Sequence, residues 1–363
     1  MSNAVHNSVD AMQDDVSPLG SVEPERKYHR LKSVNPKRAQ KVAKLRAIRS
    51  INVATGKLAV AKQCFECLLD RINAGVEGSC LVLYGRSGAG KTHILRQLRK
   101  HPDLQPFETD EGKHQPLLCV EAPAPCTLRS LGMRILHALQ YFPRKSLREH
   151  EVWDRVRANL AAQGVAVLII DEAHNVLKGR NAPERDKIAM TIKALMVSEE
   201  NPIQVILAGL PSLSTFVDSY SELKRRAQFI ELTPLQFPRD QKNLIAFLSG
   251  LESMLGFGKA GFTEFDMPER FMAASRGLIG RMAYFAQEAA TIAVSLGSKL
   301  IDRAYLSEAY KRPYRASPDN NPFLMANVAA YRPPKGQVAE DADDLTFLKG
   351  TKQDDADDVD AAA

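Results

Sequence analysis

A glycine-rich segment at residues 85–92 has the residue types and spacing that bind nucleotide phosphates. It fits the pattern G-x-x-x-x-G-K-[ST] and consists of Gly85, Arg86, Ser87, Gly88, Ala89, Gly90, Lys91 and Thr92. Glycines let backbone N–H groups turn toward phosphate oxygens, and a following helix presents its positive end to the same anion. Lys91 should reach the β- and γ-phosphates, and the hydroxyl of Thr92 should bind Mg²⁺. The segment therefore predicts a site for ATP and Mg²⁺.

Two acidic residues, Asp171 and Glu172, close the most apolar run of the chain, VAVLIID. Beside a phosphate loop, Asp171 would hold Mg²⁺ directly or through water, and Glu172 would orient the attacking water. The alternative is that both acids only favour the start of the next helix. The second acid favours hydrolysis over a nucleoside kinase reaction.

The letters DEAH at 171–174 also spell a helicase motif, but such a helicase needs two α/β domains and the chain has one phosphate loop.

Strands and helices that could position these residues alternate along the chain. Short apolar strands are expected at residues 79–85, 117–121, 165–171, 203–209 and 228–232, with helical patterns between them, including one at 212–226. This alternation predicts an α/β fold with a mostly parallel sheet. After Pro238 only helices are expected. The predicted parts are a disordered or basic extension, a nucleotide-binding domain, a small all-helical lid and a flexible acidic tail, at residues 1–50, 51–237, 238–312 and 313–363.

Charge is distributed unevenly over the 363 residues. Ten Lys or Arg and no acidic residue lie between Arg26 and Arg49, whereas nine acids and two lysines lie between Glu340 and Asp360. A basic body favours contact with a polyanion, although simple solvation explains the basic segment equally well. No run of eighteen apolar residues and no secretory signal pattern is present, so we expect a cytoplasmic protein without a membrane contact.

Four segments together resemble AAA+ ATPases: GRSGAGKT, VAVLIIDEAH, ILAGLPSLSTFVDSYSELKRRAQFIEL and GLIGRM. Within that superfamily the chain looks most like the TniB/TnsC-type transposition ATPases, to which phage Mu B protein is functionally related. The resemblance covers roughly residues 50–311. It implies a P-loop AAA+ fold, with a parallel five-stranded sheet flanked by helices and followed by the helical lid. The subgroup rests on weaker features than the two nucleotide motifs.

The resemblance also implies roles for three arginines. Arg226, or alternatively Arg225, falls where such proteins place an arginine finger that acts on a neighbouring subunit. Arg281 matches the lid arginine that contacts the γ-phosphate. The alternative for Arg225 and Arg226 is a solvated basic helix end, and the alternative for Arg281 is a surface ion pair. The strand end at residues 207–210 lacks the Asn or Thr that usually senses the γ-phosphate in such proteins. Either Ser212 or the backbone takes over this role, or hydrolysis is slow.

The same resemblance implies a homo-oligomer, a ring or helical filament, that grips double-stranded DNA when ATP is bound. Its further partners would be a transposase and a target-selection protein of the TniQ type. Candidate DNA contacts lie in the loops after the first two strands and in the basic N-terminal run: Lys113, Thr127, Arg129, Lys37, Arg38, Lys41 and Lys44. For each of these residues, an ordinary surface position is the alternative.

Two other functions stay open. One is a different AAA+ role, such as a replication initiator, a helicase loader or a secretion-type ATPase. An initiator is expected to carry a helix-turn-helix module after the lid, and residues 313–363 look too unstructured for one. The other is a scaffold that binds nucleotide without hydrolysis, which the missing polar residue at the strand end keeps open.

Overall fold

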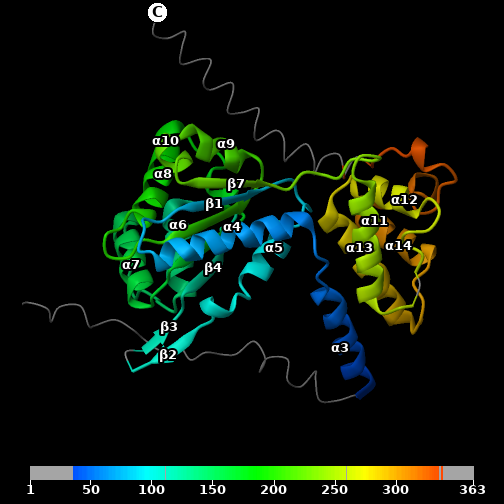
Figure 1. Ribbon diagram of the computed structural model, residues 1–363, viewed down its shortest axis with the longest axis horizontal. Coiled ribbons are helices and arrows are strands. Elements are labelled where there is room, and N and C mark those ends of the chain that lie inside the picture. The colour runs from blue at the N-terminus through cyan, green and yellow to red at the C-terminus, as the bar shows by residue number, and fades with distance from the viewer. Residues whose placement is uncertain (1–35, 111, 259, 335–336, 338–363) are drawn as a thin grey trace, which may run out of the picture.

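The computed structural model describes residues 36–110, 112–258, 260–334 and 337. An α/β part and a helical part lie side by side (Figure 1). Five strands form one parallel sheet in the order β4-β5-β6-β1-β7. Their bounds are Cys80–Tyr84 for β1, Leu117–Glu121 for β4, Val167–Asp171 for β5, Gln204–Gly209 for β6 and Ala227–Glu231 for β7. The predicted five-stranded parallel sheet is confirmed.

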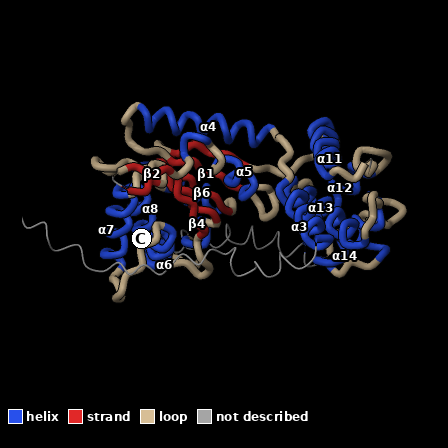
Figure 2. The backbone as a smooth tube through the Cα atoms, turned by 90° about the horizontal axis from the view of Figure 1, so that it is seen from below, coloured by secondary structure: helices blue, strands red, loops and turns tan. Residues whose placement is uncertain are grey.

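Helices cover both faces of this sheet, as Figure 2 shows. Alternate side chains of β1 divide between two cores: Leu81 and Leu83 face one, and Cys80 and Val82 face the other. The first core is closed by α4 (Gly56–Asn73) and α5 (Lys91–Leu98). The second is closed by α6 (Leu128–Ala138), α7 (Glu149–Ala162), α8 (Ala182–Met196) and α9 (Ser212–Ser219). Burial on both faces explains why the strands are continuously apolar.

Two local features differ from the sequence-based expectation. An antiparallel hairpin of β2 (Phe107–Thr109) and β3 (Gly112–His114) lies between α5 and β4. Its strands are short and mostly exposed, so no apolar alternation marks them. The helix expected at 212–226 is divided into α9 and α10 (Ser221–Lys224), because Tyr220 between them has an extended backbone.

The helical part is the predicted lid, and it extends further than expected. It contains α11 (Gln241–Leu255), α12 (Met267–Ser275), α13 (Ile279–Leu296) and α14 (Arg303–Tyr314), and two short 3₁₀ turns follow, Pro318–Asn320 and Val328–Ala330. Phe323 is fully buried in the lid core. The buried Arg270 donates hydrogen bonds to the carbonyls of Pro322 and Met325, at 2.5 and 2.9 Å. Part of the predicted tail therefore packs with the lid helices, while residues 335–336 and 338–363 lie outside the described ones.

A basic helix, α3 (Pro36–Ser50), occupies part of the predicted disordered or basic extension. Proline suits a first helical position. Ile48 is buried in the lid core, and Arg49 donates to a carboxylate oxygen of Glu288 on α13 at 2.8 Å. The segment is therefore docked on the lid, while residues 1–35 lie outside the described ones. Within the described residues, no helix has the length and apolar character needed to cross a membrane.

Candidate functional site

The phosphate loop joins the end of β1 to the start of α5, as the motif predicts. Gly88 and Gly90 have φ values of 80° and 102°, which L side chains rarely adopt. A Cβ on Gly85 would lie 2.8 Å from the carbonyl oxygen of Leu232. The three glycines are therefore required by backbone conformation or by close packing.

Lys91 is buried at the first position of α5. Its Nζ donates to the carbonyls of Gly85 and Arg86, at 2.8 and 3.2 Å. The helix start and this ammonium place positive charge at the loop, where a phosphate would bind.

Thr92 and Asp171 lie in contact, although β6 separates β5, which ends at Asp171, from β1, which leads into the phosphate loop before Thr92. The hydroxyl of Thr92 donates to Oδ2 of Asp171 at 3.0 Å. Hard oxygen donors of this kind suit Mg²⁺, which usually keeps waters and takes the remaining ligands from phosphates. The pair therefore fits a magnesium ion that arrives with the nucleotide.

Glu172 has a left-handed backbone, with φ 52° and ψ 33°. Such a conformation costs about 1–2 kcal/mol in a residue other than glycine, and it often occurs at functional sites. Its amide donates to Oδ1 of Asp171 at 2.9 Å, and its carboxylate is partly exposed. The structure thus holds the two acids together beside the phosphate loop, and the role of Glu172 stays a prediction.

His174 lies next to this pair, with Nδ1 3.4 Å from Oε2 of Glu172. Burial, then the charges of Lys91 and Lys178, lower the pKa of His174 to about 4. The ring is therefore neutral near pH 7, and its contact with Glu172 is not an ion pair. Ser212, the residue proposed to replace the missing polar side chain, is buried, and its Oγ has no hydrogen-bond partner among the described residues.

The lid touches the phosphate loop through the start of α13. The amide of Arg281 donates to the carbonyl of Gly88 at 3.1 Å, and a Cβ on Gly88 would lie 2.6 Å from Cγ of Arg281. A Cβ on Gly280 would lie 2.5 Å from the same carbonyl oxygen. The structure therefore brings Arg281 to the loop, and its contact with a γ-phosphate stays a prediction.

A pocket continues from the phosphate loop into the space between the α/β part and the lid. Apolar side chains supply much of its wall: Ile51, Val53, Ile94, Leu232, Leu278 and Ile279. Nε2 of His93 in this wall lies 2.6 Å from Oδ1 of Asn52 and holds the segment before α4 in place. Apolar walls beside a phosphate site suit a flat nucleobase. Sequence reasoning missed this pocket, because segments far apart in the chain build it together.

Arg225 and Arg226 lie at the other end of the sheet from the phosphate loop. The carbonyl of Arg226 accepts from the amide of Cys80 at the first residue of β1, whereas the loop follows the last residue. Five residues of strand separate these ends by about 16 Å. Arg226 forms an ion pair with Glu77, and Arg225 is exposed. Together with Arg71 they line a surface hollow. Because of the distance between the two ends of β1, neither arginine can reach the phosphate loop of its own subunit.

The predicted DNA contacts do not gather at one place. Lys113 is exposed on β3, opposite Glu108. Thr127 is exposed and caps α6 by accepting from the amide of Ser130. Arg129 donates to the carbonyl of Leu147 at 2.8 Å and to the hydroxyl of Ser146 at 3.0 Å, so its guanidinium holds a neighbouring loop.

The basic N-terminal candidates lie on α3. Arg38 and Lys44 are exposed there, and Lys41 is half-buried. Lys37 is also in α3, but its side chain is not among those described.

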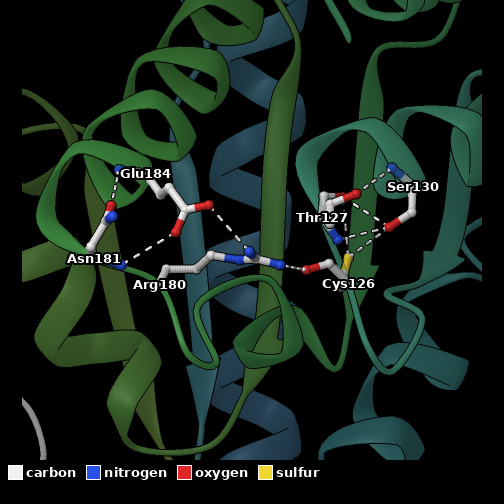
Figure 3. A network of polar contacts seen from close by, with 6 residues as sticks. All are labelled: Cys126, Thr127, Ser130, Arg180, Asn181 and Glu184. Atoms are coloured by element: carbon white, nitrogen blue, oxygen red, sulfur yellow. Dashed lines mark hydrogen bonds and ion pairs between the residues drawn. The ribbon is translucent and has the colours of Figure 1, made fainter. Parts of the chain in front are cut away.

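The loop of residues 122–127 between β4 and α6 is tied to the segment after Glu172. Arg180 donates to the carbonyl of Cys126 at 2.7 Å and to Glu184 at 3.2 Å (Figure 3). At the other end of the loop, Asn175 donates to the carbonyl of Ala122 at 3.1 Å. Sequence reasoning did not single out Arg180 or Asn175, because only the strand order brings the two segments together.

Comparisons with known proteins agree with this geometry. Residues 75–217 match the family described as AAA domain. Cdc6p from Pyrobaculum aerophilum is similar in structure at 16% identity and a TM-score of 0.52, over 73% of this chain and 70% of that chain. The Aeropyrum pernix ORC2 protein, in ADPNP–ADP complexes, is similar at 15% identity and 0.53, over 75% and 72%.

A third similar structure is the Aeropyrum pernix ORC1 protein in complex with DNA, at 18% identity and a TM-score of 0.52, over 73% of this chain and 67% of that chain. No curated protein matches the chain by sequence. At these identities the similarity shows the fold alone. The chain therefore has the AAA+ P-loop fold, a parallel sheet with flanking helices and a helical lid, and residues 75–217 match an AAA domain.

Proposed function

We propose that the chain is an ATPase whose active site is completed by a second copy of itself. The observation that carries this proposal is the position of Arg225 and Arg226, at the end of β1 opposite to the phosphate loop. One subunit would contribute the loop, Asp171 and Glu172, and the next would contribute an arginine that stabilises the developing phosphoryl charge. ATP bound between two copies would then make hydrolysis depend on assembly.

We propose that the copies of the chain assemble on duplex DNA. Exposed cations on α3, including Arg38, Lys44 and Arg46, carry no acidic neighbour within the helix. Contacts of this type bind the phosphate backbone, carry no base information and weaken with salt. The Aeropyrum pernix ORC1 protein, which has a similar fold, was solved in complex with DNA. Sequence-independent binding to duplex DNA is therefore the expected mode.

Within this function, the sequence resemblance supports a regulator of transposition. ATP-bound subunits would form a ring or helical filament that marks target DNA and recruits a transposase and a target-selection protein of the TniQ type. Hydrolysis would then dismantle the filament. The fold similarity to Cdc6 and ORC proteins supports a second candidate, a replication initiator.

Electron microscopy and an ATPase assay on the full chain test these proposals together. With random-sequence duplex DNA and a non-hydrolysable ATP analogue, we expect rings or filaments, and with ATP a rate that rises when DNA is added. Lys91→Ala should abolish both. A chain that stays monomeric and ignores DNA at saturating nucleotide would refute the proposal. Binding confined to one DNA sequence would favour the initiator, and nucleotide binding without turnover would favour a scaffold.

A further inference from the structure

The end of β6 lies beside the phosphate loop but carries no side chain. The carbonyl of Gly209 accepts from the amide of Gly85 at 3.2 Å, so the two backbones touch. A Cβ on Gly209 would lie 3.2 Å from both the backbone N and Nδ1 of His174. The imidazole of His174 therefore occupies the space that a side chain at position 209 would enter.

This imidazole has two functional neighbours. Nδ1 lies 3.4 Å from Oε2 of Glu172, the expected water-positioning carboxylate. Lys91, the expected phosphate-binding residue, is close enough for its charge to act on the ring. His174 thus borders both groups from the strand end where a polar residue is missing.

Nδ1 of His174 is buried and makes no hydrogen bond within the described part of the chain. An unsatisfied buried polar atom costs about 1–3 kcal/mol, so such atoms usually have a structural or functional reason. The nearest carboxylate can supply the missing bond with a small movement, because 3.4 Å is only slightly longer than an ordinary N–H···O distance. A neutral imidazole has one N–H to donate, and a carboxylate can only accept.

We propose that His174 is the positioning residue for hydrolysis, with its Nδ1–H donating to Glu172 and holding that carboxylate against the attacking water. It would replace the polar residue that β6 lacks. The inference rests on the proposed ATPase function. His174 acts through Glu172 and makes no covalent bond, so the reaction needs no additional co-reactant.

Substitutions at His174 separate this role from simple packing. The amide nitrogen of an Asn side chain reaches the position of Nδ1, whereas that of Gln reaches the position of Nε2. His174→Asn should therefore retain most of the hydrolysis rate, while His174→Ala and His174→Gln should lower kcat by about 10- to 100-fold, the range for one hydrogen bond to a charged group. The matched control is His101→Ala, which removes another histidine whose ring lies beside a carboxylate, with Nε2 3.2 Å from Oε1 of Glu66, and which should leave kcat unchanged.

Three further measurements test whether His174 acts through Glu172. The affinity for ATP in an equilibrium titration should stay within about twofold in His174→Ala, because the residue holds no phosphate. In a Glu172→Gln background, His174→Ala should cause no further loss of turnover, since the two residues act as a unit. His174→Ala should also prolong the lifetime of ATP-bound assemblies on DNA.

The outcomes distinguish this inference from the proposed function. A wild-type chain that hydrolyses ATP, with His174→Ala equally active, would overturn the role of His174 and leave the ATPase intact. Equal loss in His174→Asn and His174→Ala would overturn the assignment of Nδ1 as the donor. A wild-type chain that binds ATP without any hydrolysis would overturn both proposals.

Discussion

Gly280→Ala should weaken ATP binding by moving the lid off the phosphate loop. Gly280 is the second residue of α13, and a Cβ there would lie 2.5 Å from the carbonyl oxygen of Gly88 and 3.1 Å from the amide nitrogen of Gly90. Both are backbone atoms, so neither can rotate away. Ordinary contact begins at about 3.4 Å, and the start of α13 must therefore retreat by about 1 Å.

Arg281 follows Gly280 and would retreat with it. A hydrogen bond from a guanidinium to a phosphate is worth about 1.5–3 kcal/mol, which corresponds to about 10- to 100-fold in affinity. ADP lacks the γ-phosphate, so its affinity should fall much less. The fold should persist, because alanine is favoured over glycine in a helix by up to about 1 kcal/mol.

Equilibrium titrations with ATP and with ADP, together with thermal unfolding, measure these effects. Gly56→Ala is the matched control, since Gly56 also begins a helix and a Cβ there meets nothing within 4 Å. Wild-type affinity for ATP in Gly280→Ala would refute the assignment of Arg281 to the γ-phosphate. An equal loss for ATP and ADP would show that the displaced contact is to another part of the nucleotide.

Three other predictions concern hydrolysis and stability. Whichever of Arg225→Ala and Arg226→Ala lowers hydrolysis should recover when mixed with Lys91→Ala subunits, and no recovery would argue against action across subunits. Arg180 holds the loop that ends at Thr127, a candidate DNA contact, through its bond to the carbonyl of Cys126. Arg180→Ala should therefore reduce stimulation of the ATPase by DNA without changing the basal rate, and unchanged stimulation would argue against a DNA contact at this loop. The folded-state pKa of His174 lies below its unfolded value, so the unfolded chain binds more protons between about pH 6.5 and 4. The free energy of unfolding should therefore fall as the pH is lowered through that window, and less in His174→Asn; equal pH dependence in both chains would show that His174 is not responsible.

Local sequence was sufficient for the parts of the site that are contiguous. The phosphate loop could be predicted because its glycines, Lys91 and Thr92 belong to one turn and the first helical residues after it. The strand before it and the strand that ends at Asp171 could be predicted because burial on both faces requires an unbroken apolar run. The β2–β3 hairpin and the break at Tyr220 were missed, because short exposed strands and one extended residue leave no periodic signal.

The domain boundaries required the tertiary structure. Residues 313–334 look like a loose tail in the sequence, yet Phe323 is fully buried and Arg270 holds the backbone beside it. The composition of the basic segment at 36–50 gives no sign of a packed residue, yet Ile48 is buried in the lid core. Single anchoring residues of this kind cannot be recognised from composition, because their burial depends on partners far away in the chain.

By itself, the sequence determined that a phosphate loop and two acids stand at the ends of buried parallel strands, because backbone conformation and burial act on neighbouring residues. Only the tertiary structure decided which distant groups meet: Thr92 with Asp171, Arg281 with the loop, and His174 with the end of β6. It also placed Arg225 and Arg226 beyond reach of their own phosphate loop. Strand order and lid docking decide these distances, and both arise from packing across the whole core rather than from spacing along the chain.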